Sequence, residues 1–132
     1  MISVKLLKIN HNTVDSYNIL KEILISEIVY DSFKDFLNPD KKQCINIIHQ
    51  TNNSLPTDVI WIHDDILNII LTRISIIKKK REVLIKLTSD NNPSKVELLS
   101  NMYDLNSLDG IIREYFSHNS NFQFGIFIDM VY

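Results

Sequence analysis

The sequence predicts an α/β domain, with an α+β arrangement as the alternative, in which a small sheet of about three mostly parallel strands packs under several helices. Two observations favour this class. Segments with the composition of strands occur at 2–9, 82–88 and 122–130, and the segments between them have the apolar spacing of helices. The last two strands are separated by about thirty residues, the length of a helical crossover between parallel neighbours.

The composition is that of one soluble domain spanning residues 1–132. Hydrophobic residues make up 45% and charged residues 23% of the chain, and a domain of this length buries a sizeable core without disulfides or metals. The single cysteine, Cys44, excludes an internal disulfide and favours a reducing compartment. The longest apolar stretch is too short to span a bilayer and contains Arg73. We therefore expect a cytoplasmic protein that does not bind membranes.

The first half of the chain is expected to be one strand followed by helices. Segment 2–9 alternates apolar and polar residues, which predicts a strand with one face in water. Segment 13–37 has apolar residues at a helical spacing, among them Leu20, Leu24 and Ile28. A second helix is expected over 40–50 and a loop over 51–56. Segment 58–62 is compatible with a short strand or with the first turns of the next helix.

The second half is expected to form a helix, a strand, two short helices and a final strand. A helical period begins at Asp64 and ends in the basic run 73–81, whose charges suit a helix end, with phosphate binding as the alternative interpretation. The β-branched segment 82–88 predicts a strand. Helices are expected over 94–103 and 107–118. The nearly continuous apolar segment 122–130 predicts a strand that is buried on both faces and parallel to 82–88.

The net charge of −2 is unevenly distributed. The last third of the chain has a single basic residue, Arg113, against five acids: Glu97, Asp104, Asp109, Glu114 and Asp129. An acidic face of this kind attracts cationic partners and repels nucleic acid. We therefore expect a protein partner and no direct contact with nucleic acid.

Few residues are spaced for catalysis or for cofactor binding. The only glycines, Gly110 and Gly125, exclude the glycine-rich phosphate loops. The four histidines, His11, His49, His63 and His118, are scattered, so we expect no cofactor and no metal. His63 stands beside Asp64 and Asp65, either as a cation site or as a polar helix start in which the acids favour the helix dipole. Cys44 is expected to be a buried structural thiol.

One spacing raises the alternative of an enzyme. Arg113 and His118 form Arg-x4-His, the spacing found in the HEPN ribonucleases. Five residues turn a helix by about 140°, so these two side chains would not share a face within one chain. If the protein is an enzyme, we expect it to be a small nuclease that uses either this HEPN-like pair or a metal site at His63 and Asp64.

Segment 103–116 resembles the helix-opening motif of the barstar family, bacterial inhibitors that neutralise a ribonuclease toxin. The family pattern reads approximately Tyr-x-x-Asn-Leu-Asp-Ala-Leu-Trp-Asp. With Ser107 as an insertion, the matching residues are Tyr103, Asn106, Leu108, Asp109, Gly110 and Ile111. The order strand, helix, strand over 82–130 agrees with the family, whereas Ile112 and Arg113 stand where it has tryptophan and a second acid.

The resemblance implies an immunity protein that binds a cognate toxin domain, expected to be a nuclease, and covers its cationic active site with an acidic surface. Such a protein needs no catalysis. Gly110 would let the partner approach the helix backbone closely, although Ser107 and Asp109 would serve equally as an ordinary helix start. A helical protein–protein interaction module is a further alternative. The expected partner-binding residues are Tyr103, Asp104, Asn106, Asp109, Gly110, Arg113, Glu114 and Tyr115.

Overall fold

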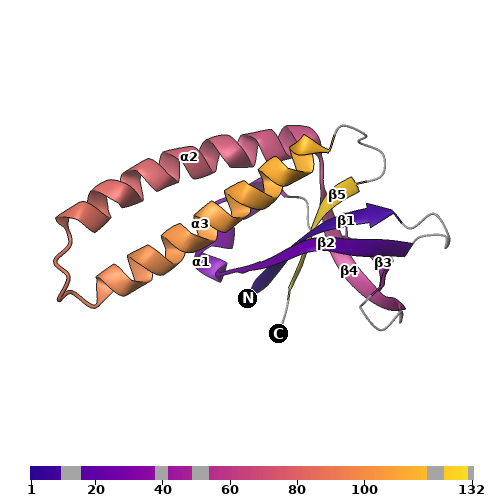
Figure 1. Cartoon of the computed structure of the whole chain (residues 1–132), viewed down its shortest axis with the longest axis horizontal. Helices are drawn as coiled ribbons and strands as arrows, with labels where there is room; N and C mark the ends of the chain where they lie inside the picture. Colours follow the sequence, from indigo (N-terminus) through magenta and orange to yellow (C-terminus); the bar gives the residue numbers. More distant parts are fainter. Residues whose placement is uncertain (10–15, 38–41, 49–53, 119–123, 131–132) are drawn as a thin grey trace.

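Five strands close into a barrel, and two long helices form a hairpin that lies across it and projects beyond it (Figure 1). The computed structural model describes residues 1–9, 16–37, 42–48, 54–118 and 124–130. In chain order the elements are β1 (Ile2–Ile9), β2 (Ser16–Ile25), α1 (Glu27–Asp31), the 3₁₀ helix η1 (Lys34–Phe36), β3 (Lys42–Ile48), β4 (Ser54–Ile62), α2 (Asp64–Leu87), α3 (Ser94–Ser117) and β5 (Phe124–Met130).

The barrel follows the chain order, with one parallel seam. β1 is antiparallel to β2 and to β5, and β4 is antiparallel to β3 and to β5. β2 and β3 close the ring as a short parallel pair, in which Tyr17 lies opposite Ile47. The connection between these two parallel strands contains α1 and η1, as a crossover requires. The antiparallel strands β4 and β5 are likewise joined through helices, α2 and α3. A bulge at Leu6 and Leu7 leaves Leu20 of β2 without a partner in the register.

The barrel wall separates two apolar cores. The larger core lies between the outer face of the barrel and the helices, and it includes Val4 of β1 and Ile128 of β5 together with Ile70 of α2 and Leu108 of α3. The smaller core contains side chains from the strands alone, and these fill the barrel interior: Leu7, Ile45, Ile47, Val59 and Phe127, with Tyr17 and Ile19 at its edge. Alternate residues of one strand therefore serve different cores.

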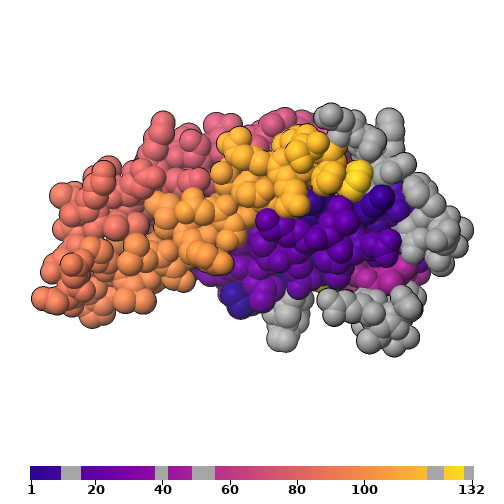
Figure 2. Space-filling view, viewed as in Figure 1, coloured from indigo at the N-terminus to yellow at the C-terminus, as the bar shows by residue number. Residues whose placement is uncertain are grey.

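The outer half of the helical hairpin extends past the barrel (Figure 1). The last buried residue of α2 is Ile74, and the first buried residue of α3 is Asn101. Between them, the two helices contact each other but bury no side chain fully. In the space-filling view, α3 and β2 form one continuous surface beside this projection (Figure 2).

The predicted fold class is wrong. The structure has a closed five-stranded mixed barrel with two long helices in place of a three-stranded, mostly parallel sheet under several helices. Segment 82–88 belongs almost entirely to α2, so β5 cannot pair with it, and β5 is antiparallel to both of its neighbours. The basic run 73–81 accordingly lies inside α2 and not at its end. The strand–helix–strand order of the barstar resemblance is absent.

The expected helix over 13–37 is wrong over 16–25, which form β2, and in its described part the segment is helical only in α1 and η1. The expected helix over 40–50 is a strand where it is described, because residues 42–48 form β3, and residues 54–56 of the expected loop begin β4. Residues 13–15, 40–41 and 49–53 lie outside the described residues. The two expected helices over 94–103 and 107–118 are one. α3 runs without a break from 94 to 117. The strands at 2–9 and 124–130 and the helix start at Asp64 are confirmed. The expected wet face of β1 is wrong, because Ser3 and Lys5 are buried.

Candidate partner-binding site

The expected partner-binding residues all lie on α3, but some of them are exposed to solvent and others face the interior of the protein. Four are exposed and recur every three or four residues, so they share one side of the helix: Tyr103, Asn106, Gly110 and Arg113. Val96 and Leu99 continue the same spacing toward the tip of the hairpin, and both are exposed. We call these six residues the α3 outer face.

Tyr103 and Gly110 determine the shape of the α3 outer face. The Tyr103 side chain is 72% exposed, unusual for a large aromatic residue. A Cβ added at Gly110 would meet no atom within 4 Å, so the helix backbone there is open to close approach. The helix continues through Gly110, and Ser107 lies in its middle. Ser107 therefore does not cap a helix, and the interpretation of this segment as a helix start is wrong.

Asp104 and Tyr115 face inward and hold neighbouring elements. Asp104 is 8% exposed, and its Oδ2 accepts a hydrogen bond of 3.0 Å from the backbone N–H of Ser26, the N-cap of α1. The Tyr115 hydroxyl donates to Asp64 Oδ1 in the first turn of α2. Burial, together with the bond to Asp64, raises the pKa of Tyr115 above its ordinary value. Both side chains position α3 rather than face solvent.

The two remaining acids are engaged by cations of the same chain. Asp109 Oδ1 accepts a hydrogen bond of 2.8 Å from Arg113 Nε, and Asp109 Oδ2 lies 3.5 Å from Lys78 Nζ of α2. Glu114 lies 3.2 Å from Lys21 Nζ of β2. The expected acidic surface is therefore balanced by neighbouring positive charges. Its carboxylates can meet a cationic partner only by exchanging these ion pairs.

The other residues considered from sequence are dispersed. The His63 ring packs on Trp61 with a centroid distance of 4.1 Å, and Asp64 and Asp65 occupy the first turn of α2, as the helix-start interpretation predicted. The His118 ring stacks on Phe124. In the part of the chain that the structure describes, no three His, Cys, Asp or Glu side chains are grouped to hold a metal.

Cys44, the basic run 73–81 and two of the histidines were also considered from sequence. Cys44 lies exposed on β3, so the expected burial of this thiol is wrong. In the basic run, Arg73 lies over the ring of Phe36 and Lys78 contacts Asp109, so part of its charge is used within the fold. His11 and His49 lie outside the described residues.

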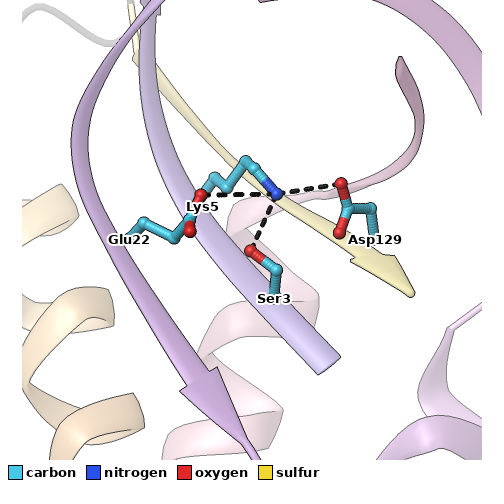
Figure 3. A network of polar contacts seen from close by, with 4 residues as sticks. All are labelled: Ser3, Lys5, Glu22 and Asp129. Carbon is cyan, nitrogen blue, oxygen red and sulfur yellow. Dashed lines mark hydrogen bonds and ion pairs between the residues drawn. The ribbon is translucent and has the colours of Figure 1, made fainter. Parts of the chain in front are cut away.

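A polar cluster inside the barrel was missed by sequence reasoning. Lys5 Nζ donates to Ser3 Oγ at 2.7 Å and to Asp129 Oδ2 at 2.9 Å, and it lies 3.6 Å from Glu22 Oε2 (Figure 3). The Lys5 side chain is 7% and that of Asp129 12% exposed. Ser3 and Asp129 are register partners, as are Lys5 and Glu22. The only sequence signal was the alternation of segment 2–9, which was assigned to a wet face.

No family model, curated protein or solved structure matches this chain. Within the described residues, no helix combines the length and the hydropathy that crossing a bilayer requires.

Proposed function

We propose that this chain is an immunity protein: a cytoplasmic, non-catalytic protein that binds and neutralises a bacterial toxin domain, with the α3 outer face as its contact surface. The toxin domain would be a nuclease of the kind used in contact-dependent growth inhibition. The observation that carries the proposal is the continuous exposure of six residues along one side of α3, with Tyr103 at its centre.

The chemistry of the α3 outer face suits a protein partner. Its outer half is apolar, with Val96, Leu99 and Tyr103, and tyrosine is among the residues enriched at binding hot spots. Its inner half presents a small residue, Gly110, beside the cation Arg113. A partner helix or loop can approach closely at the glycine while Tyr103 fills a pocket on the partner.

Asp109 and Glu114 border this surface and give it a way to engage a cationic active site. The pairs of Glu114 with Lys21 and of Asp109 with Arg113 involve exposed cations and contribute only about 0–1 kcal/mol each in water. A toxin cation that is desolvated against the same carboxylate would form a stronger pair. Glu114 can therefore exchange its partner at small cost when the toxin binds, whereas Asp109 would also have to give up its half-buried pair with Lys78.

The binding test uses the toxin domain encoded directly upstream of this gene, the position expected of a cognate toxin. We expect the wild-type protein to form a stable complex with it and to abolish its toxicity on co-expression. Tyr103→Ala is expected to weaken binding by about thirtyfold, the equivalent of a hot spot of about 2 kcal/mol. Gly110→Arg is expected to block close approach and to abolish the complex.

Matched variants separate this surface from general effects. Thr72→Arg places the same side chain at an exposed position of α2 and is expected to leave binding unchanged. Lys21→Ala removes the cation that competes for Glu114 and is expected to strengthen binding if that carboxylate engages the toxin. The proposal is wrong if the upstream domain does not bind, or if Tyr103→Ala and Gly110→Arg bind it as tightly as the wild type.

A further inference from the structure

A hollow of about 290 Å³ opens at the end of the barrel where β1 ends and β5 begins. Aromatic side chains form much of its lining, including Tyr17 of β2, Trp61 of β4 and Phe127 of β5. Tyr17 meets Phe127 edge to face, with ring centroids 5.5 Å apart. Its other described lining residues are Ile9, Gln43, Phe124 and Gly125. The hollow is distinct from the α3 outer face, which belongs to another element.

Gly125 lets two aromatic rings pack directly on β5. A Cβ at position 125 would lie 2.8 Å from Cε2 of Phe127 and 3.2 Å from Nε1 of Trp61. Those two rings therefore occupy the space that a side chain would need. Glycine weakens the interior of a strand, and in such a position it often marks a place where another group approaches the backbone closely. At Gly125 the Phe127 and Trp61 rings make that approach, so the glycine determines where these two walls of the hollow lie.

Trp61 is held as one wall of the hollow and remains accessible. Its indole is 43% exposed, and the ring of His63 packs against it at a centroid distance of 4.1 Å. A second hollow, of about 220 Å³, adjoins the same indole and is lined in part by Phe36 and Ile66. Trp61 therefore stands between two recesses with its position fixed by His63. A fixed, accessible aromatic ring stacks a planar ligand with little loss of side-chain entropy.

The lining defines the chemistry of the ligand. None of the described residues that line the hollow has a charged side chain, so the described lining itself favours an uncharged ligand. One cation lies beside it: Lys8 Nζ is 5.7 Å from the ring centroid of Phe124. Gln43 is exposed, and its amide both donates and accepts hydrogen bonds. An apolar cavity of about 150 Å³ holds benzene, so a hollow nearly twice as large accommodates a two-ring system. We propose that this hollow binds an uncharged, purine-sized heteroaromatic ring, stacked on Trp61 and hydrogen-bonded at its edge by Gln43.

The chain provides its own reporter for this site, because Trp61 is its only tryptophan. Adenosine and guanosine, titrated into the full-length protein, are expected to change the Trp61 emission in a saturable way. Half-saturation is expected on the order of 0.1 mM, the affinity that a typical binding energy per atom gives for a nucleoside. Adenosine 5′-monophosphate is expected to bind no more tightly than adenosine.

The two glycines of the chain give matched variants. Gly125→Ala is expected to weaken nucleoside binding at least tenfold, since its methyl group would displace the Phe127 and Trp61 rings that form walls of the hollow. Gly110→Ala makes the same chemical change where no atom lies within 4 Å, and binding is expected to stay within twofold of the wild type. Gln43→Leu, at an exposed position, is expected to weaken binding three- to tenfold and tests the site even if Gly125→Ala does not fold.

Several outcomes would overturn the proposal. These are a wild-type emission that shows no saturation up to the solubility limit of either nucleoside, a Gln43→Leu variant that binds as tightly as the wild type, and a folded Gly125→Ala variant that does so. Binding of the monophosphate tenfold more tightly than adenosine would overturn the assignment of an uncharged ligand, because it would show that a cation such as Lys8 engages the ligand.

Discussion

The ion pair inside the barrel makes a sharp prediction about stability. Lys5→Met removes the ammonium group but keeps a side chain of similar length, so the main change is electrostatic. Asp129 would then be left inside the barrel without its cation, with one carboxylate oxygen, Oδ1, that is buried and lacks a hydrogen-bond partner among the described residues. The unfolded state exposes both groups to water, so the cost falls on the folded state.

The expected magnitude follows from the burial of the pair. Its two side chains are only 7% and 12% exposed, and Nζ and Oδ2 are 2.9 Å apart. Breaking a buried pair by removing one partner costs about 3–5 kcal/mol. Domains of this size are stable by about 5–15 kcal/mol in total. Lys5→Met is therefore expected to remove a large part of the free energy of unfolding.

A double-mutant cycle separates the pair from the rest of the barrel. Lys5→Met combined with Asp129→Leu leaves neither charge unpaired, so the double variant is expected to be more stable than the sum of the single changes by at least about 1 kcal/mol. Urea unfolding, followed by Trp61 fluorescence and circular dichroism, measures each free energy. Lys21→Met, which breaks the exposed pair with Glu114, is the control and is expected to cost less than about 1 kcal/mol. The reasoning is refuted if Lys5→Met costs no more than this control.

Three further changes test the inner side of α3 and its glycine. Asp104→Ala removes the acceptor of the Ser26 N–H and is expected to cost about 1–3 kcal/mol in urea unfolding, whereas a surface acid would cost almost nothing. Gly110→Ala is expected to stabilise the free protein by about 0.5–1 kcal/mol, and a loss of stability would show that its backbone is not an ordinary open helix. The raised pKa of Tyr115 means that the folded state favours the neutral phenol, so its contribution is complete below the ordinary value of 10.0 and declines as the pH rises above it. Tyr115→Phe is therefore expected to be less stable at neutral pH but to lose less stability between pH 9 and 11 (about one unit on each side of that value), and equal alkaline losses in the two proteins would contradict this origin.

Helical periodicity misled the prediction of β2 because the side chains that produced it are exposed. Leu20 and Leu24 are each 44% exposed, and Ile28, which continues the spacing into α1, is 50% exposed. β2 fully buries only its end residues Ser16 and Ile25, while the partly buried Tyr17 and Ile19 pack on the smaller core and Ile23 packs on the larger one. A composition rich in isoleucine and leucine places apolar residues at many spacings, so this segment matched the helical spacing by chance. Its pairing with β1 makes it a strand.

The same cause explains the error at 82–88. Val83 and Leu87 belong to a β-branched, apolar run that resembles a buried strand, yet both are exposed on the projecting part of α2. No turn residue separates this run from the helix before it, so α2 continues to Leu87. By contrast, β5 was predicted correctly because Ile126 and Ile128 face one core and Phe127 the other, which fits a continuous apolar run.

The candidate site was predicted in part, for a reason that lies in helix geometry. The sequence identified α3 as a region of interest, and Tyr103, Asn106, Gly110 and Arg113 do share an exposed side. The sequence could not show that Asp104 turns inward, because that depends on where the N-terminus of α1 lies, and α1 is 78 residues away from it along the chain. Ion pairs between elements, such as Lys21 with Glu114, are equally invisible without the fold.

Arrangement, more than exposure, distinguishes the α3 outer face from the exposed apolar residues of β2. Leu20 and Leu24 are exposed on β2, but polar residues stand between them, as is common in soluble proteins. On α3 the exposed positions follow one another on the same side, and the apolar ones gather toward the tip, where neither helix of the hairpin buries a side chain fully. A helix in that situation gains little from tertiary packing. A partner that covers Val96, Leu99 and Tyr103 would supply the burial that the free hairpin lacks, and for this reason we propose the α3 outer face as the contact surface.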